Sequence, residues 1–192
     1  MHFFKKNYKK STEAELMQLL KSGDEAAFEE LYNRYSQKML KFFLRMLAND
    51  HDKARDFNQD LFMKIIENPF QYDVNRNFDT WIFSLAYNMC KNEYKKIKIR
   101  QAYQFDEQNK QDTSVLMKDT IDNEIYRLQL QKHLDQLSDE HKTIIILRFN
   151  EELSVKEIAE IVNCPEGTVK SRIFYTLQAL SRKLAVFNPL NN

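Results

Sequence analysis

The sequence predicts an all-α protein made of two small helical domains that are joined by a flexible acidic linker. Glycine and proline, which interrupt helices, supply only two and three of the 192 residues. No segment shows the alternation of apolar and polar residues that marks a half-buried strand. Apolar residues instead recur at helical spacing from about Thr12 to Ile97, and again from about Asp119. We therefore expect helices along most of the chain, with one interruption near its middle.

Composition divides the chain into four segments. Residues 1–12 are expected to form a basic, frayed N-terminal tail, and residues 13–97 the first helical domain. Residues 98–120 are expected to form the linker, and residues 121–187 the second helical domain. Between Gln104 and Glu124, six acidic residues face only two lysines and polar side chains fill the rest, a composition typical of flexible linkers.

Several classes of protein are disfavoured by the sequence. No apolar run approaches the roughly 18 residues that a membrane span requires, and the N-terminus lacks the apolar region of a secretory signal. Cys90 and Cys164 are too few for a disulfide framework or a zinc site. The four histidines are scattered and no glycine-rich phosphate loop is present. We expect a cytoplasmic protein that is not an enzyme and that holds no metal and no cofactor.

Near the C-terminus the sequence predicts a helix, a tight break and a second helix. Ser154 and Glu157 have the spacing of a capping box, which gives the first of these helices a defined start. Asn163 begins the break. Cys164 is expected at the cap of the second helix, and Pro165 at its first position, where the missing N–H costs nothing.

The second of these helices is predicted to have two different faces. The face expected to be buried carries Val169, Ile173, Leu177, Leu180 and Leu184. The opposite face carries Thr168, Lys170, Ser171, Arg172 and Tyr175. A helix fits the major groove of DNA, and these side chains suit phosphates and base edges. Residues 168–183 include four basic residues and no acidic one, which favours DNA binding over a solvated basic face.

Residues 54–67 are predicted to form a helix with an acidic face. Its buried stripe is expected to contain Ala54, Phe57, Leu61 and Ile65. The opposite face carries Asp56, Gln59, Asp60 and Glu67. Because two carboxylates four residues apart repel each other on a helix, a basic partner would explain Asp56 and Asp60. Physical chemistry alone gives equal weight to a solvated acidic face.

A third candidate surface combines a loop with the helix that follows it. The helix is expected to run from Asn77 to about Lys96 with an outer face of Ser84, Tyr87, Asn88, Lys91 and Lys95. Aromatic rings stack on unpaired bases while lysine neutralises phosphate, so this face suits nucleic acid. The preceding loop, residues 68–76, adds rings and amides that could hold a flipped base. Phe78 and Trp81 are expected in the core, whereas Phe70 and Tyr72 suit either a core or a stacking role.

Together these segments resemble the extracytoplasmic-function group of bacterial RNA polymerase sigma factors over nearly the whole chain. Residues 23–32 resemble the start of the promoter-melting domain of that family, and residues 56–62 resemble its polymerase-binding helix. Residues 78–81 resemble the opening of its melting helix. Residues 164–172 are similar to the recognition helix for the upstream promoter element.

The resemblance implies a role for each surface. The clamp coiled coil of core RNA polymerase would be bound by Asp56, Gln59 and Asp60. The minus-ten promoter element would be bound by Phe70, Tyr72, Arg76, Asn77, Tyr87, Asn88, Lys91 and Lys95. The minus-thirty-five element would be bound by Glu166, Thr168, Lys170, Ser171, Arg172 and Tyr175. The implied partners are core RNA polymerase, through its clamp and flap, promoter DNA, and a separate anti-sigma protein; we expect a monomer when the protein is free.

Two departures from the family limit what the resemblance transfers. Ile66 stands where the family often has an aromatic residue, and the loop has its own sequence, so no minus-ten base preference follows. A dimeric helix-turn-helix response regulator is the main alternative, but it needs a sensory domain in place of the first hundred residues. A helical protein-binding adaptor would leave the two basic faces unexplained.

Overall fold

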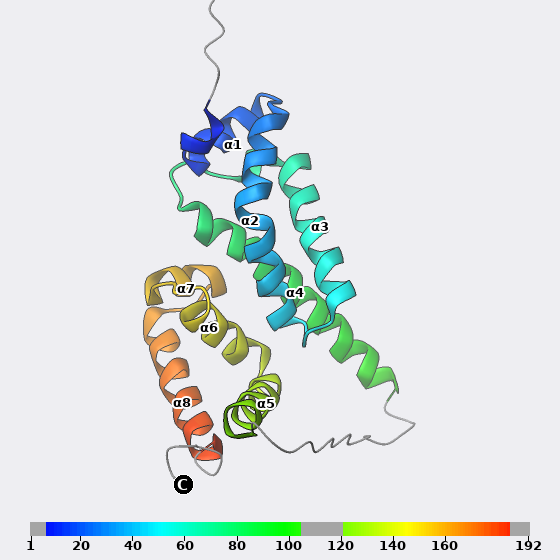
Figure 1. Cartoon of the computed structure of the whole chain (residues 1–192), viewed down its shortest axis with the longest axis vertical. Coiled ribbons are helices and arrows are strands. Elements are labelled where there is room, and N and C mark those ends of the chain that lie inside the picture. Colours follow the sequence, from blue (N-terminus) through cyan, green and yellow to red (C-terminus); the bar gives the residue numbers. More distant parts are fainter. Residues whose placement is uncertain (1–6, 105–120, 185–192) are drawn as a thin grey trace, which may run out of the picture. The chain divides into compact units, whose positions relative to one another are not determined.

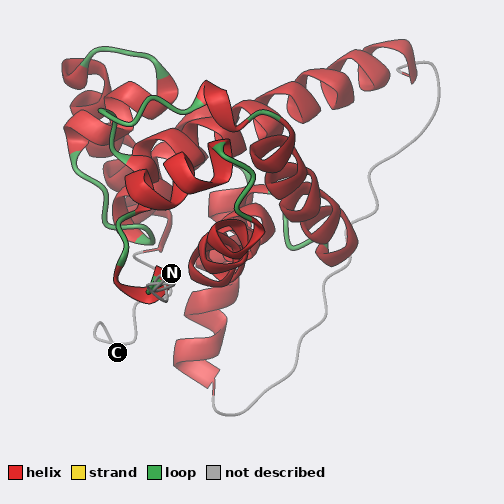
Figure 2. Cartoon of the chain, turned by 90° about the horizontal axis from the view of Figure 1, so that it is seen from above, coloured by secondary structure: helices red, strands yellow, loops and turns green. Residues whose placement is uncertain are grey.

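The computed structural model describes residues 7–104 and 121–184. In chain order the elements are η1 (Tyr8–Lys10), α1 (Glu13–Lys21), α2 (Glu25–Met46), α3 (His51–Glu67), η2 (Pro69–Gln71), α4 (Phe78–Gln104), α5 (Ile121–Asp135), α6 (Asp139–Phe149), α7 (Val155–Val162) and α8 (Glu166–Leu184). Within these ranges every regular element is a helix and none is a strand (Figures 1 and 2). This confirms the all-α prediction.

The contacts within the chain define two compact units, Met1–Cys90 and Lys91–Asn192, called here the first and the second unit. The helix that was expected to end at about Lys96 is longer, because α4 continues to Gln104. The start of the expected linker at residue 98 is therefore helical. Residues 105–120, which make up the rest of the expected linker, lie outside the described residues.

The first unit is built around α2, which packs against α1 and α3. Thr12, Asp24 and Asp50 cap α1, α2 and α3, each through a side-chain oxygen that accepts from a backbone N–H. Edge-to-face rings fill the interior: Phe42 lies 5.3 Å from Phe83 between ring centroids.

The stripe predicted for α3 is nearly correct. Ala54, Leu61 and Ile65 are buried, whereas Phe57 is half-buried with its ring centroid 5.6 Å from that of Phe43. Asn58 is buried in addition, which the sequence did not predict because asparagine seldom occupies a core position.

The expectation of a frayed tail is wrong for the described part of residues 1–12. Arg34 on α2 donates hydrogen bonds to two backbone oxygens of this segment, at 3.0 Å to Tyr8 and 2.9 Å to Ser11. The Tyr8 hydroxyl in turn donates to the carboxylate of Asp24 at 3.1 Å. The guanidinium of Arg34 also pairs with Glu30 and Glu13, which keeps it in place. Residues 1–6 lie outside the described residues.

In the second unit α6, α7 and α8 pack on one another, and α5 packs on α8. The most continuously buried segment of this unit is in α6, in which residues 142–147 are all buried. Two members of the predicted buried face of α8 depart from the prediction: Ile173 is only half-buried, and Leu177 is 41% exposed. Thr176 is buried instead. The hydroxyl of Thr176 lies 3.1 Å from Nδ1 of His141 on α6, so a hydrogen bond satisfies the buried polar group.

Candidate polymerase and nucleic-acid interfaces

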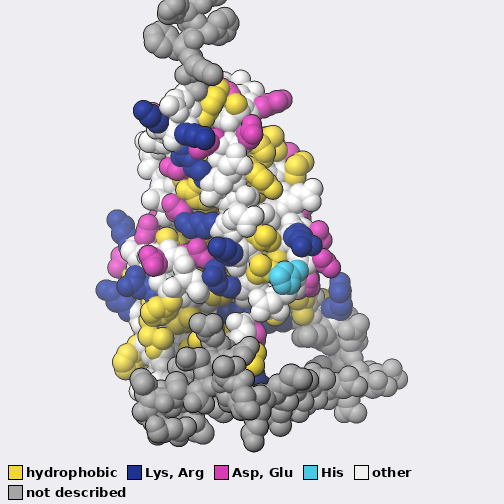
Figure 3. Space-filling model, in the orientation of Figure 1, with side chains coloured by type: hydrophobic (Ala, Val, Ile, Leu, Met, Phe, Trp, Pro, Cys, Tyr) yellow, Lys and Arg dark blue, Asp and Glu magenta, His cyan; other side chains and the backbone are white. Residues whose placement is uncertain are grey.

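The acidic face of α3 is open to solvent. Asp56, Gln59 and Asp60 are all exposed, because Ala54, Leu61 and Ile65 turn the opposite side of the helix into the core. Acidic and hydrophobic side chains both reach the surface over α3 (Figure 3).

Two apolar side chains extend this face toward the end of α3. Met63 and Ile66 are 49% and 38% exposed, and Tyr32 on α2, 43% exposed, lies with its ring centroid 4.8 Å from that of Phe62. Carboxylates beside exposed apolar groups suit a protein partner with basic and apolar side chains. Neither Met63 nor Tyr32 belongs to the face predicted from the sequence.

The loop between α3 and α4 is organised around a buried tyrosine. Tyr72 is only 2% exposed, and its ring centroid lies 5.0 Å from that of Trp81 and 5.4 Å from that of Phe78. The expectation that Tyr72 presents an exposed ring to DNA is therefore wrong. Phe78 and Trp81, each 5% exposed, are core residues as expected.

Other residues of this loop point outward. Phe70 is 76% exposed, and Arg76 and Asn77 are exposed as well. The side-chain oxygen of Asn77 accepts a hydrogen bond from the backbone N–H of Thr80 at 3.0 Å, so this residue also caps the start of α4. The loop thus offers one exposed ring, a guanidinium and an amide within eight residues, 70–77.

The outer face of α4 is narrower than predicted. Asn88, Lys91 and Lys95 are exposed, but Tyr87 is only 5% exposed and belongs to the core. Tyr87 follows the buried Phe83 by four residues, so the two side chains lie on the same side of the helix. Tyr72 and Tyr87 are therefore both packing residues, at 2% and 5% exposure.

In the second unit the helix-turn-helix forms as predicted. Ser154 and Glu157 make a reciprocal capping box at the start of α7, with Ser154 N donating to Glu157 Oε2 at 2.8 Å. Asn163 ends α7 in the left-handed conformation, with φ of 53°. The second helix begins at Glu166, one residue later than expected, so Pro165 precedes α8 and its carbonyl accepts from Val169 N.

The predicted DNA-binding face of α8 is exposed over most of its length. Glu166, Lys170, Ser171 and Tyr175 are exposed, Tyr175 by 62%, and Thr168 is half-buried. Opposite them Val169, Leu180 and Leu184 are buried and fix the rotation of the helix about its axis.

Arg172 on this face has a partner from another helix. Its Nη2 lies 2.6 Å from Oε2 of Glu140 on α6, and the two side chains are 28% and 54% exposed. Glu140 is absent from the site predicted above, because nothing in the sequence links α6 to this position of α8. The exposed ring of Phe174, beside Tyr175, was also missed.

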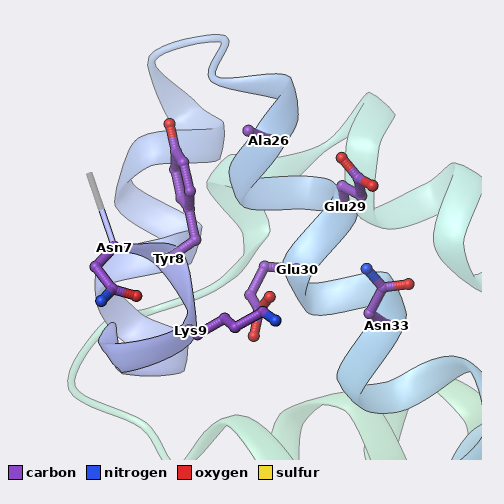
Figure 4. Close-up of a pocket in the computed structure, with 7 residues that line it drawn as sticks. All are labelled: Asn7, Tyr8, Lys9, Ala26, Glu29, Glu30 and Asn33. Atoms are coloured by element: carbon purple, nitrogen blue, oxygen red, sulfur yellow. The ribbon is translucent and has the colours of Figure 1, made fainter. Parts of the chain in front are cut away.

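A hollow of about 580 Å³ lies between η1 and the N-terminal half of α2 (Figure 4). It is lined by Asn7, Tyr8, Lys9, Ala26, Glu29, Glu30 and Asn33. Glu30 Oε1 accepts from Arg34 Nε at 2.8 Å, so the hollow borders the contacts that hold the N-terminal segment. None of the predicted site residues lines it.

The described residues contain no group of three or more histidine, cysteine, aspartate or glutamate side chains that could hold a metal ion. Among the helices of the described residues, none combines the length and the apolar composition that a membrane span requires.

Comparisons with protein families cover both units. The family model for Sigma-70 region 2 matches residues 31–99, and the model for Sigma-70 region 4 matches residues 133–182. The first range includes the α3 face, the loop and most of α4, and the second includes α6, α7 and most of α8.

The curated relatives span nearly the whole chain. The ECF RNA polymerase sigma factor SigW of Bacillus subtilis is 32% identical over 176 residues, covering 86% of this chain and 92% of that protein. The ECF RNA polymerase sigma-E factor of Haemophilus influenzae is 30% identical over 183 residues, covering 90% and 95%.

Solved structures of similar fold were determined with bound partners. CnrH in complex with the cytosolic domain of CnrY matches with a TM-score of 0.67 at 21% identity, over 91% of this chain and 97% of CnrH. The sigma factor RpoE of Bartonella quintana, in complex with the anti-sigma factor NepR, matches with a TM-score of 0.63 at 23% identity, over 83% and 97%. At these identities the likeness supports the fold.

Proposed function

Because this chain belongs to the extracytoplasmic-function (ECF) family of RNA polymerase sigma factors, we propose that its three exposed faces have separate roles in promoter recognition. One face binds the polymerase, and the other two bind the two promoter elements. The protein is a sigma factor that directs promoter-specific initiation by core RNA polymerase. One observation carries the proposed division. On α8, Lys170, Ser171 and Tyr175 are exposed together opposite the buried Val169 and Leu180, within the match to region 4.

The first face binds core RNA polymerase. Asp56, Gln59 and Asp60 contact the clamp coiled coil through charge and hydrogen bonds, and the exposed Met63 beside them adds apolar contact. The exposed carboxylates lose little hydration in the free protein and gain basic partners when the polymerase binds.

The second face captures and melts the minus-ten element. Phe70 and Arg76 in the loop and Lys91 and Lys95 on α4 are exposed, which allows stacking on an unpaired base and contact with phosphates. Asn77 and Asn88 add amides that can hydrogen-bond to base edges. Tyr72 and Tyr87 are left out of this surface because both are buried.

The third face binds the minus-thirty-five element as α8 enters the major groove. Lys170 and Tyr175 reach phosphates, while Thr168, Ser171 and Arg172 lie toward the base edges. Glu166 stands at the N-terminus of α8 and can accept a hydrogen bond from a cytosine amino group.

The domain bounds predicted above belong to the same proposal. Residues 13–97 form the promoter-melting and polymerase-binding domain, residues 121–187 the helix-turn-helix domain, and residues 98–120 the connection between them. The free protein is a cytoplasmic monomer whose partners are promoter DNA, core polymerase through its clamp and flap, and a separate anti-sigma protein. Nucleotide addition is catalysed by the polymerase.

Three promoter fragments test this division of roles: one with both elements, one with the minus-ten element replaced, and one with the minus-thirty-five element replaced. Holoenzyme reconstituted with the wild-type protein is expected to open only fragments that retain the minus-ten element, and to bind less tightly without the minus-thirty-five element. If the protein bound these fragments as a dimer, and bound them equally well when polymerase was absent, the result would instead support the response-regulator alternative.

A further inference from the structure

The loop between α3 and α4 rests on a lysine that none of the predicted sites contained. Lys21 is the last residue of α1, and its Nζ donates a hydrogen bond to the backbone oxygen of Tyr72 at 2.7 Å. The same Nζ lies 5.9 Å from the centroid of the Tyr72 ring. Lys21 is half-buried, and α1 packs against η2, the first part of the loop.

Tyr72 contacts both Lys21 and Arg76, which lies near the C-terminal end of the loop. Its hydroxyl donates to the backbone oxygen of Arg76 at 2.7 Å, and its ring is enclosed by Phe78 and Trp81. Two backbone carbonyls of the loop are thereby fixed, one by Lys21 and one by the tyrosine hydroxyl. Both hydrogen bonds are partly buried, and each adds a net stabilisation to this loop conformation over alternatives that lack it.

The same loop is held from within at its exposed turn. Asp73 Oδ1 accepts from the backbone N–H of Asn75 at 3.0 Å, and the backbone N–H of Arg76 donates to Asp73 O at 3.0 Å. The exposed side chains of Phe70 and Arg76 therefore project from a backbone with fixed positions at residues 72, 73 and 76. A surface that is ordered before binding pays less entropy when it captures a ligand.

We propose that Lys21 and Tyr72 are positioning residues for minus-ten recognition: they hold the loop in the shape that captures an unpaired base, without contacting DNA themselves. This inference rests on the proposed function of the loop as the minus-ten surface. It assigns a role in promoter opening to α1, an element outside the region 2 match, which begins at residue 31.

Three variants separate the contacts. Lys21→Met keeps the apolar stem and removes the donor, Lys21→Arg keeps a cationic donor, and Tyr72→Phe keeps the ring and removes the hydroxyl. Lys41→Met is the matched control, since Lys41 is an exposed lysine on α2. Thermal unfolding followed by circular dichroism establishes that each variant is folded.

The first readout uses the free protein. Trp81 is the single tryptophan of the chain and lies against Tyr72, so its quenching by acrylamide reports the order of the loop. We expect Lys21→Met and Tyr72→Phe to increase quenching, and Lys21→Arg and Lys41→Met to behave as the wild type. Unchanged quenching in both Lys21→Met and Tyr72→Phe would overturn the inference.

The second readout is promoter opening by holoenzyme on templates that carry each of the four bases at each minus-ten position. Lys21→Met and Tyr72→Phe are expected to lower discrimination between bases by about tenfold, the size of effect expected from the loss of one intramolecular hydrogen bond. Binding to core polymerase and to the minus-thirty-five element stays unchanged, and Lys21→Arg restores selectivity.

The two readouts distinguish failure of the positioning role from failure of the proposed minus-ten function. A loosened loop with full base selectivity would overturn the positioning role and leave the proposed function standing. A wild-type holoenzyme without any minus-ten selectivity would overturn the proposed function and the positioning role with it.

Discussion

Nη2 of Arg172 lies 2.6 Å from Oε2 of Glu140, so an arginine on the proposed recognition face of α8 is held by a carboxylate from α6. Both side chains are partly exposed, at 28% and 54%, and pairs of this kind contribute only about 0–1 kcal/mol to stability. The ion pair therefore orients the guanidinium of Arg172, and breaking the pair to free this side chain costs little free energy. A phosphate or a guanine can replace the carboxylate when DNA binds.

Arg172→Ala is expected to weaken binding to the minus-thirty-five element by about 1–3 kcal/mol, the range for loss of a base contact. Competition binding by holoenzyme on fragments with and without this element measures the effect. Lys132→Ala, which removes an exposed cation from the last turn of α5, is the control. Equal activity of Arg172→Ala and wild type on both fragments would show that α8 does not read the element through this residue.

Asp60→Lys is expected to reduce the affinity for core polymerase, because the substitution reverses a charge on the proposed clamp-binding face. Asp60 is exposed, so the free energy of unfolding should change by no more than about 0.5 kcal/mol. Titration of labelled protein with core polymerase measures the affinity. Asp52→Lys, at an exposed position in the first turn of the same helix, provides the control. Normal holoenzyme assembly by Asp60→Lys would remove this face from the account.

Gly167→Ala is expected to have opposite effects on stability and on DNA binding. A Cβ built at Gly167 meets no atom within 4 Å, and replacing glycine by alanine where the backbone suits both residues stabilises a protein by about 0.4–1 kcal/mol. The chain itself therefore gives no steric reason for glycine at this position. Close approach of the DNA backbone to the first turn of α8 would give one.

The alanine variant should unfold at higher temperature and bind the minus-thirty-five element less tightly. Calorimetry and competition binding on the same preparation measure both effects. Higher stability together with undiminished binding would show that DNA does not approach this turn closely.

Stability should decrease at alkaline pH through Tyr35. Burial, and then the negative charge of Asp79, raise the pKa of this tyrosine above its ordinary value of 10.0. The contribution of the protonated tyrosine to stability is complete below pH 10.0 and is lost as the pH rises further, because only the unfolded chain then ionises.

Urea unfolding between pH 8 and 11 measures this loss, which for one such group approaches about 1.4 kcal/mol per pH unit above pH 10. Tyr35→Phe removes the ionisable group, so its stability should fall less steeply over the same interval. Parallel pH profiles for the variant and the wild type would exclude Tyr35 as the cause.

Local sequence signals predicted the elements well, and the helix-turn-helix best of all. The capping box of Ser154 and Glu157 and the break at Asn163 each depend on residues within a few positions of one another. Helical spacing likewise identified the exposed face of Asp56 and Asp60, because the buried residues opposite them are regularly spaced.

Side-chain burial at the margins of helical faces could not be predicted in the same way. Tyr87 lies at the edge of an apolar stripe, where a small rotation of α4 decides between core and solvent, and a tyrosine suits either. Thr176 replaces Leu177 in the core because His141 on another helix provides its hydrogen-bond partner.

Contacts between distant segments left no signal in the sequence at all. Lys21 and Tyr72 are 51 residues apart, and neither belongs to a pattern that points to the other. The family resemblance implies a DNA-binding role for Tyr72, whereas the structure places this residue at the centre of the loop.

Transcription from genomic DNA fragments by sigma-free bacterial core RNA polymerase, with and without the purified protein, tests the central claim most directly. Sequencing the 5′ ends of the transcripts should reveal discrete start sites that depend on the protein and share two upstream motifs. With a core enzyme from the matching organism and a folded protein, transcripts without such protein-dependent start sites would contradict the assignment as a promoter-specific sigma factor.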